Sequence, residues 1–146
     1  MERNSSALIQ RWFEEVWNNQ RFEAIDQLLA AGVVSNGHDS NPIGIVEMKK
    51  FVRAMLTGFP DIHFALDEPV SQGDRASAFW RARMTHSGIF MGIAPTGRQV
   101  SIFGIAMARF RDGKIVESWN SWDQFGLLSQ IGAVSTAGIF PTLAAG

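Results

Sequence analysis

The sequence of 146 residues contains no cysteine and no tyrosine. Without cysteine, thiolate catalysis, iron–sulfur clusters, cysteine zinc sites and disulfide scaffolds are all excluded. Charged residues are also scarce, at 18% of the chain, compared with roughly 25% in an average soluble domain. Aromatic side chains are abundant by contrast, with 11 Phe and 5 Trp. This composition predicts a single domain whose interior is large and apolar.

The charges that are present nearly balance, with 13 Lys and Arg against 14 Asp and Glu. No run of basic residues forms the positive surface that phosphate groups bind, so no nucleic-acid partner is expected. From residue 124 onward the chain has no charge, but Gly, Ser, Thr and Pro141 interrupt this stretch, and we expect no membrane span. The first residues lack the apolar core of a signal peptide, which predicts a cytoplasmic location.

The first 60 residues have the apolar spacing of three helices. A serine before the first apolar residues is a good N-cap, an Asn pair ends that pattern, a glycine ends the second, and a proline ends the third. The predicted helices run from Ser5 or Ser6 to Asn18, from Arg21 to about Gly32, and from Ile45 to Pro60.

After Pro60 the apolar pattern changes from helical to alternating, which is typical of strands. We expect one α+β domain over residues 1–146, with a core at about 5–132 and an uncharged tail at 133–146. In this fold three N-terminal helices cover a strongly curved antiparallel sheet, and the resulting cone-shaped barrel encloses a pocket. The strands are expected near 62–66, 75–87, 100–110 and 114–122, before a last helix from about 123.

Motifs for metals and nucleotides are absent from the sequence. His38, His63 and His86 lie in three different predicted elements, and none has a second ligand three or four residues away on a helix. No glycine-rich phosphate loop occurs, so we expect neither a metal nor a cofactor. The expected ligand is a hydrophobic small molecule, because the surplus of Phe and Trp would line the pocket.

Asp123 is the best candidate for acid–base chemistry. It ends a predicted strand beside Trp119 and Trp122 and is followed by uncharged sequence. Desolvation there would favour a carboxyl group that can both donate and accept a proton. Aspartate is also a preferred N-cap, so Asp123 could do no more than cap the last helix. The residues alone leave both roles open.

Four segments occur in order over most of the chain: 13–18 (FEEVWN), 85–97 (THSGIFMGIAPTG), 109–119 (RFRDGKIVESW) and 122–128 (WDQFGLL). In this order they resemble the SnoaL-like polyketide cyclase, or ester cyclase, family of the nuclear transport factor 2-like superfamily. The resemblance extends over residues 12–132 and implies the cone-shaped α+β fold. It also implies cofactor-independent acid–base catalysis on a hydrophobic carbonyl compound, by intramolecular aldol cyclisation or a related isomerase or lyase reaction.

The resemblance also implies roles for individual residues. Asp123 matches the general acid/base of the family's cyclases, and Asn36 falls near a family Asn that hydrogen-bonds substrate. Met107 and Arg109 stand where those cyclases have Gln and His, and Arg109 could pair with Asp123 or with a substrate oxygen. His86 matches a frequent family histidine, which could polarise a substrate carbonyl or orient the loop that follows it.

Trp17, Trp80 and Trp119 could bind planar rings by stacking in the pocket, or could pack as ordinary core residues. Related cone-fold enzymes stabilise an oxyanion with Tyr hydroxyl groups, which this chain lacks. An Asn, Arg, His or Trp N–H group, or water, would have to take that role.

Two other functions stay open. One is a non-catalytic module of the same fold that binds a small molecule. The other is a cone-fold epoxide hydrolase, which needs an Asp-Arg-Asp set, whereas this chain offers only Arg109 and Asp123. We also expect a homodimer, with the contact made either by the uncharged tail or by the outer face of the sheet, where Arg81 and Arg83 alternate with Phe79.

Overall fold

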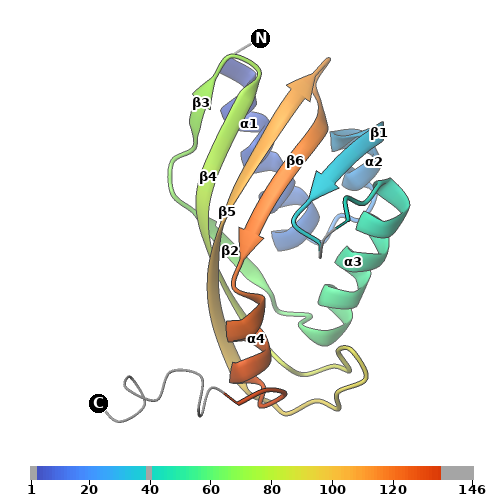
Figure 1. Ribbon diagram of the computed structural model, residues 1–146, viewed down its shortest axis with the longest axis vertical. Helices are drawn as coiled ribbons and strands as arrows, with labels where there is room; N and C mark the ends of the chain where they lie inside the picture. The colour runs from blue at the N-terminus through green and yellow to red at the C-terminus, as the bar shows by residue number, and fades with distance from the viewer. Residues whose placement is uncertain (1–2, 39–40, 136–146) are drawn as a thin grey trace.

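The computed structural model describes residues 3–38 and 41–135. Helices come mainly first and a meander of long strands follows, as the periodicity predicts (Figure 1). The helical elements are α1 (Arg3–Arg11), the π-helical segment η1 (Trp12–Asn18), α2 (Ala24–Leu28), α3 (Ile45–Gly58) and α4 (Gln124–Gln130). The strands are β1 (Leu29–Asn36), β2 (His63–Leu66), β3 (Val70–Gln72), β4 (Arg75–Thr85), β5 (Gln99–Arg111) and β6 (Lys114–Trp122).

The first helical stretch, α1 followed directly by η1, buries its apolar side. It ends at Asn18 as predicted, and the Asn18 amide pairs with both backbone groups of Phe64 in β2, at 2.7 and 2.9 Å. The predicted serine cap is wrong. Ser5 is buried inside α1, and its Oγ donates a hydrogen bond to the carbonyl oxygen of Gly73 at 3.1 Å. A tertiary contact therefore explains this serine better than a local one.

The second helix is shorter than predicted, because strand β1 already begins at Leu29. Leu29 pairs with Ile115, and β1 runs parallel to β6. The sheet is therefore mixed, not purely antiparallel as we expected. Local pattern could not reveal this pairing, since it joins segments that are far apart in the sequence and tertiary context overrides propensity in strands.

The six strands follow the order β1-β6-β5-β4-β2, and β3 also pairs with β4. Strands β2 and β3 occupy successive parts of β4, because β2 pairs with 80–83 and β3 with 75–77. The long strands curl, and α1 and α3 lie toward the hollow side of the curled sheet (Figure 1). The structure thus confirms the α+β fold with helices against a strongly curved sheet.

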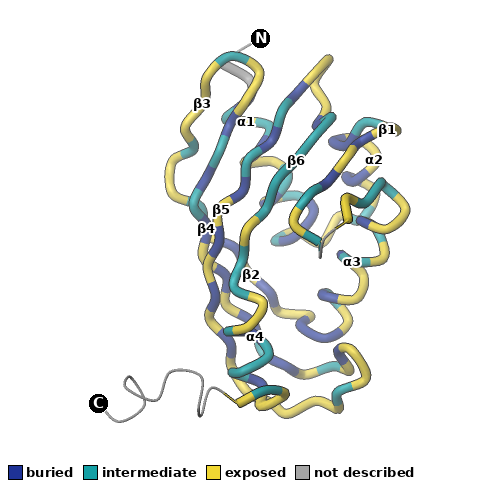
Figure 2. Tube along the Cα trace, in the orientation of Figure 1, coloured by how far each residue is buried: buried dark blue, intermediate teal, exposed yellow. Residues whose placement is uncertain are grey.

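Strand β4 shows the predicted alternation of its side chains. Even-numbered residues from Ala76 to Met84 are buried, whereas odd-numbered residues from Ser77 to Thr85 are half-buried or exposed (Figure 2). Buried positions in β5 alternate in the same way. The inner face of this strand pair packs toward the helices, and the outer face is accessible to solvent or to another molecule.

Helix α4 folds back onto β5 after β6 ends. The Gln130 side-chain amide forms two hydrogen bonds of 2.9 Å with the backbone of Ser101. Ser101 lies beyond Gly104, which pairs with the last residue of β6. Gln130 thus supplies partners to backbone groups that β6 does not reach. The tail that we expected at 133–146 lies outside the described residues from 136 on.

Candidate functional site

An apolar cavity lies between the helices and the inner face of the sheet. Its free space is about 70 Å³, inside a hollow of about 790 Å³ that includes the open mouth. The free space is smaller than the roughly 150 Å³ cavity that holds benzene in another protein. A ligand of several rings would therefore displace wall side chains. Met48 and Met55 of α3 are suited to this, because their unbranched side chains change shape at low cost.

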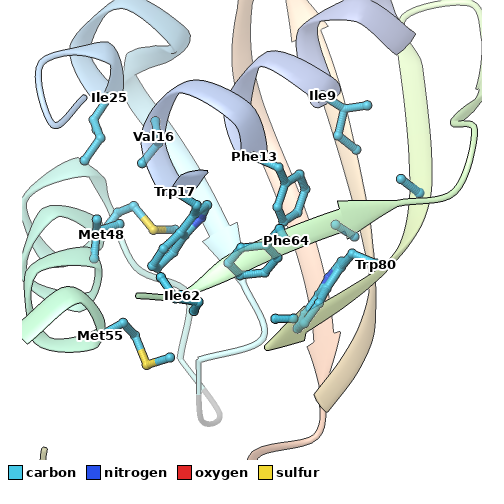
Figure 3. Close-up of a cluster of buried hydrophobic side chains, with 14 of the residues drawn as sticks. Ile9, Phe13, Val16, Trp17, Ile25, Met48, Met55, Ile62, Phe64 and Trp80 are labelled. Atoms are coloured by element: carbon cyan, nitrogen blue, oxygen red, sulfur yellow. The ribbon is translucent and has the colours of Figure 1, made fainter. Parts of the chain in front are cut away.

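One wall of the cavity is a cluster of aromatic rings around Phe64 (Figure 3). The ring centroids of Phe13, Trp17 and Trp80 lie 5.1, 5.3 and 5.0 Å from that of Phe64, in tilted or edge-on arrangements. Such arrangements are the favourable ones for aromatic pairs, so the rings support one another. This wall is apolar and well packed, as is typical of sites for hydrophobic ligands.

Polar groups gather where β1 and β6 run side by side. Ser118 Oγ donates to Ser35 Oγ at 3.0 Å, and both residues line the cavity. Asn36, the next residue of β1, donates from Nδ2 to the carbonyl oxygen of Ser118 at 3.0 Å, and it is not part of the cavity wall. The strand register therefore brings Ser35, rather than Asn36, to the cavity.

Asn120 and Trp122 continue this polar wall along β6. Trp80 Nε1 donates to Asn120 Oδ1 at 3.2 Å. An indole nitrogen can only donate, so the amide oxygen of Asn120 must face Trp80, and its N–H groups must face elsewhere. Trp122 Nε1 is buried and has no acceptor among the residues that the structure describes.

Four of the predicted substrate-binding residues line the cavity, and Trp17 and Trp80 among them are also core residues with 4% and 2% exposure. The two roles weighed for these tryptophans are therefore compatible. The remaining predicted site residues lie outside the wall. Inside are Trp17, Trp80, Met107 and Trp119, and outside are Asn36, His86, Arg109 and Asp123.

Asp123 caps helix α4, which was one of the two roles open to it. Its Oδ1 accepts the backbone N–H of Gly126 at 2.8 Å. The side chain is half-buried and is not part of the cavity wall, although Trp122 beside it is. A catalytic role for Asp123 stays a prediction.

Arg109 forms its ion pair with Glu117, at 3.3 Å between Nη2 and Oε1. The register of β5 and β6 sets these two residues opposite each other. The pairing with Asp123 that we considered is thus replaced by a cross-strand pair, because Asp123 lies at the far end of β6 from this position.

His86 and His38 lie in different parts of the molecule, and only His38 lines the cavity. His86 is fully buried, and its Nδ1 lies 2.9 Å from Thr96 Oγ1, so it holds the loop between β4 and β5. Orienting this loop was one of its two predicted roles. His38 lines the cavity, with its ring edge-on to Phe51 at 5.1 Å. No pattern in the sequence indicates this position, since His38 lies in a polar loop.

Ser118, Asn120 and Trp122 on β6 are, like Ser35 and His38, cavity residues that were not predicted from the sequence. A signal was available, because alternate residues of a strand share one face and these three are spaced by two. The sequence instead favoured Asp123, because it carries an ionisable group. Within residues 3–38 and 41–135, no Asp or Glu lines the cavity, and no group of three His, Asp or Glu side chains could hold a metal ion. None of the helices in that part has the length and apolar character to cross a membrane.

Solved structures share this fold over most of the chain. AclR of Streptomyces galilaeus, described provisionally as a hydroxylase, superposes with a TM-score of 0.86 at 26% identity, over 99% of this chain and 92% of AclR. IdmH of Streptomyces antibioticus, described provisionally as a polyketide cyclase, has a TM-score of 0.76 at 30% identity, over 88% and 98% of the two chains. TsrD of Streptomyces laurentii has a TM-score of 0.78 at 25% identity, over 92% and 99%.

Among curated proteins, none matches this sequence. The model of the family of SnoaL-like polyketide cyclases matches residues 7–131. That span contains the cavity, its aromatic wall and the polar residues of β6. The chain therefore belongs to the SnoaL-like polyketide cyclase family.

Proposed function

We propose that the protein binds a hydrophobic carbonyl compound in the cavity and promotes its aldol cyclisation, or a related isomerase or lyase reaction, without a cofactor. The observation that supports this is the composition of the cavity wall. Aromatic rings would hold the carbon skeleton, while amide, hydroxyl and indole N–H groups on β1 and β6 could hydrogen-bond its oxygens. Membership of the family supports the same class of substrate.

The reaction needs one group that takes a proton and returns it. A base removes the proton from a carbon between two carbonyl groups, the enolate carbon attacks a second carbonyl, and the new alkoxide is protonated. Two residues are candidates for this group. His38 is the ionisable side chain on the described part of the cavity wall, and Asp123 is the match to the family's acid/base.

The variants Asp123→Asn and His38→Gln separate these candidates. Asparagine is as good an N-cap as aspartate, so the first variant should keep helix α4 intact. With an aromatic triketone whose ring closure changes its ultraviolet absorbance, wild-type protein should accelerate closure. Loss of the true acid/base should lower the rate by roughly 10²- to 10⁴-fold with ligand affinity retained.

A non-catalytic binding module is the second candidate function. Two observations favour it: no carboxylate of the described chain lines the cavity, and Asp123 Oδ1 already accepts the Gly126 N–H. In that case the wild type would bind the triketone and leave its rate of closure unchanged. The same assay therefore decides between enzyme and binding module.

We also propose that the outer face of the sheet forms a homodimer contact. Phe103 and Ile105 are each 56% exposed, and Phe103 stacks with Phe79 at 5.7 Å between centroids. The Arg81 guanidinium lies 4.7 Å from the centre of the Phe79 ring. An apolar patch with charged neighbours suits a two-fold contact between identical surfaces. Light scattering should show a dimer that Phe103→Ser converts to monomer, and a monomeric wild type would overturn this contact.

A further inference from the structure

Strand β6 presents N–H donors of two residues at the cavity, and the described residues supply no acceptor for them. Trp122 Nε1 is buried and unpaired within the part of the chain that the structure describes. The N–H groups of Asn120 likewise have no acceptor there, because the hydrogen bond of this side chain is made by its oxygen. Both residues belong to the cavity wall. A buried donor without an acceptor, such as the Trp122 indole N–H, is rare in folded proteins and calls for an explanation.

The orientation of the Asn120 amide is fixed by its neighbours. Trp80 on β4 reaches across β5 to hydrogen-bond Asn120 on β6. It can do so because the residue between them in the sheet, opposite Trp80, is Gly104. A methyl group at Gly104 would overlap the Trp80 ring. The glycine therefore lets the indole lie flat and hold the amide oxygen, so the amide N–H groups are turned away from Trp80.

The Trp122 indole belongs to the same arrangement. Trp122 is two residues after Asn120, so both lie on one face of β6, roughly 7 Å apart along the strand. Gly104 pairs with Trp122 as well as with Trp80, in successive strands. The Trp122 ring is further positioned by Phe51 of α3, at 6.1 Å between ring centroids. Both donors are thus held in place by packing before any ligand arrives.

We propose that Asn120 and Trp122 form a donor pair that binds a carbonyl oxygen of the ligand and stabilises the enolate that forms there. This inference rests on the proposed function and names the residues that act on the oxygen. When the base removes the proton from carbon, the electron pair of that C–H bond forms the C=C bond of the enolate, and the π pair of the carbonyl moves onto the oxygen. The two N–H groups then hydrogen-bond the resulting charge. Fixed neutral donors in an apolar site stabilise such a charge without having to reorganise. They take the place of the Tyr hydroxyl that the chain lacks.

Two aromatic probes of nearly equal shape test the pair by fluorescence titration. 2-Acetylnaphthalene carries a carbonyl oxygen, and 2-isopropylnaphthalene carries a methyl group in its place. The measured quantity is the ratio of their affinities. Wild-type protein should prefer the ketone, and Trp122→Phe, which keeps a ring but removes the N–H, should reduce that preference roughly 2- to 12-fold, as expected for one hydrogen bond. Asn120→Leu should act in the same direction.

Matched controls keep the result interpretable. Met55→Leu alters an apolar side chain of the cavity wall that carries no N–H group, and it should change the affinity for both probes together, with their ratio preserved. Thermal unfolding of each variant checks that it folds. If both probes bind and the ratio is the same in wild type, Trp122→Phe and Asn120→Leu, the donor pair is wrong while the cavity remains a binding site. If neither probe binds wild-type protein, the proposed function fails, and the donor pair with it.

Discussion

The inner and outer faces of β4 and β5 carry side chains of very different size, and the larger set is mostly outside. On the inner face, small residues leave room for Trp80 and for the rings that the helices contribute. On the outer face, large apolar and charged residues lie exposed or half-buried. Small inner residues thus create a cavity, and large outer ones create a surface for contact. The small inner residues are Ala76, Ala78, Ala82, Gly104, Ala106 and Ala108, beside the larger Trp80, Met84, Val100, Ile102 and Phe110; the large outer residues include Phe79, Arg81, Arg83, Phe103 and Ile105, beside the smaller Ser77 and Ser101.

The largest difference between the faces should appear in neighbouring residues of β4. Trp80→Ala removes a buried ring and the hydrogen bond to Asn120, and should lower the free energy of unfolding by roughly 3–5 kcal/mol. Phe79→Ala, on the outer face, loses mainly its stacking on Phe103 and should cost about 1 kcal/mol. Urea unfolding measures both. Equal losses would show that the two faces are packed alike.

A smaller effect is expected from adding one methyl group to the inner face. Gly104→Ala would push against the Trp80 ring and the Ser121 carbonyl oxygen, and should cost roughly 1–3 kcal/mol in urea unfolding. It should also weaken binding of 2-acetylnaphthalene, since Trp80 could no longer hold Asn120. Gly32→Ala is the matched control, because a methyl group there meets no atom within 4 Å. If both variants are equally stable, the close packing of Trp80 over Gly104 does not contribute to the free energy of unfolding.

A still smaller effect is expected at the N-cap of helix α4, beside the cavity residue Trp122. Asp123→Ala removes the acceptor for the Gly126 N–H and should cost roughly 0.5–2 kcal/mol, whereas Asp123→Asn should cost only a few tenths. Thermal unfolding distinguishes the two. A large loss of stability in Asp123→Asn would show that the negative charge matters for folding, and the kinetic comparison with His38→Gln would then need correction for unfolded protein.

The smallest effect concerns acid stability at the edge of the sheet. Burial opposes ionisation of Asp61, but hydrogen bonds from the Thr85 hydroxyl and backbone N–H outweigh it and lower its pKa below the ordinary value of 3.8. The folded state therefore gains stability from this carboxylate above about pH 4, and loses it as the pH falls through the lowered pKa. Asp61→Asn should flatten the loss of stability that occurs as the pH falls below about 4. An unchanged acid transition would contradict this account.

Much of the fold could be predicted because its signals are periodic. The strands expected near 100–110 and 114–122 and the alternating faces of β4 follow from local pattern, and the structure confirms them. The start of β1 and the place of Ser5 could not be predicted, because each depends on a partner distant in the sequence. The four segments of the family resemblance located the fold correctly.

The candidate site was only partly predictable. Trp17, Trp80, Met107 and Trp119 line the cavity, but polar candidates chosen for their charge or by resemblance lie outside it. Nothing in the strand pattern distinguishes Asn120 and Trp122 from their neighbours. Their interest comes from a missing acceptor and from the fixed orientation of an amide, and neither can be seen without coordinates.

The sequence by itself determined the fold class, the family and the apolar character of the interior. These depend on composition, periodicity and local motifs, which are properties of the chain as written. Tertiary structure alone decided which side chains meet in the cavity. Register across β4, β5 and β6 brings Trp80, Gly104 and Trp122 into one row, and a shift of a single residue would turn these side chains to the other face. Hydrogen-bond partners follow from that register, and with them the donors that are left for a ligand.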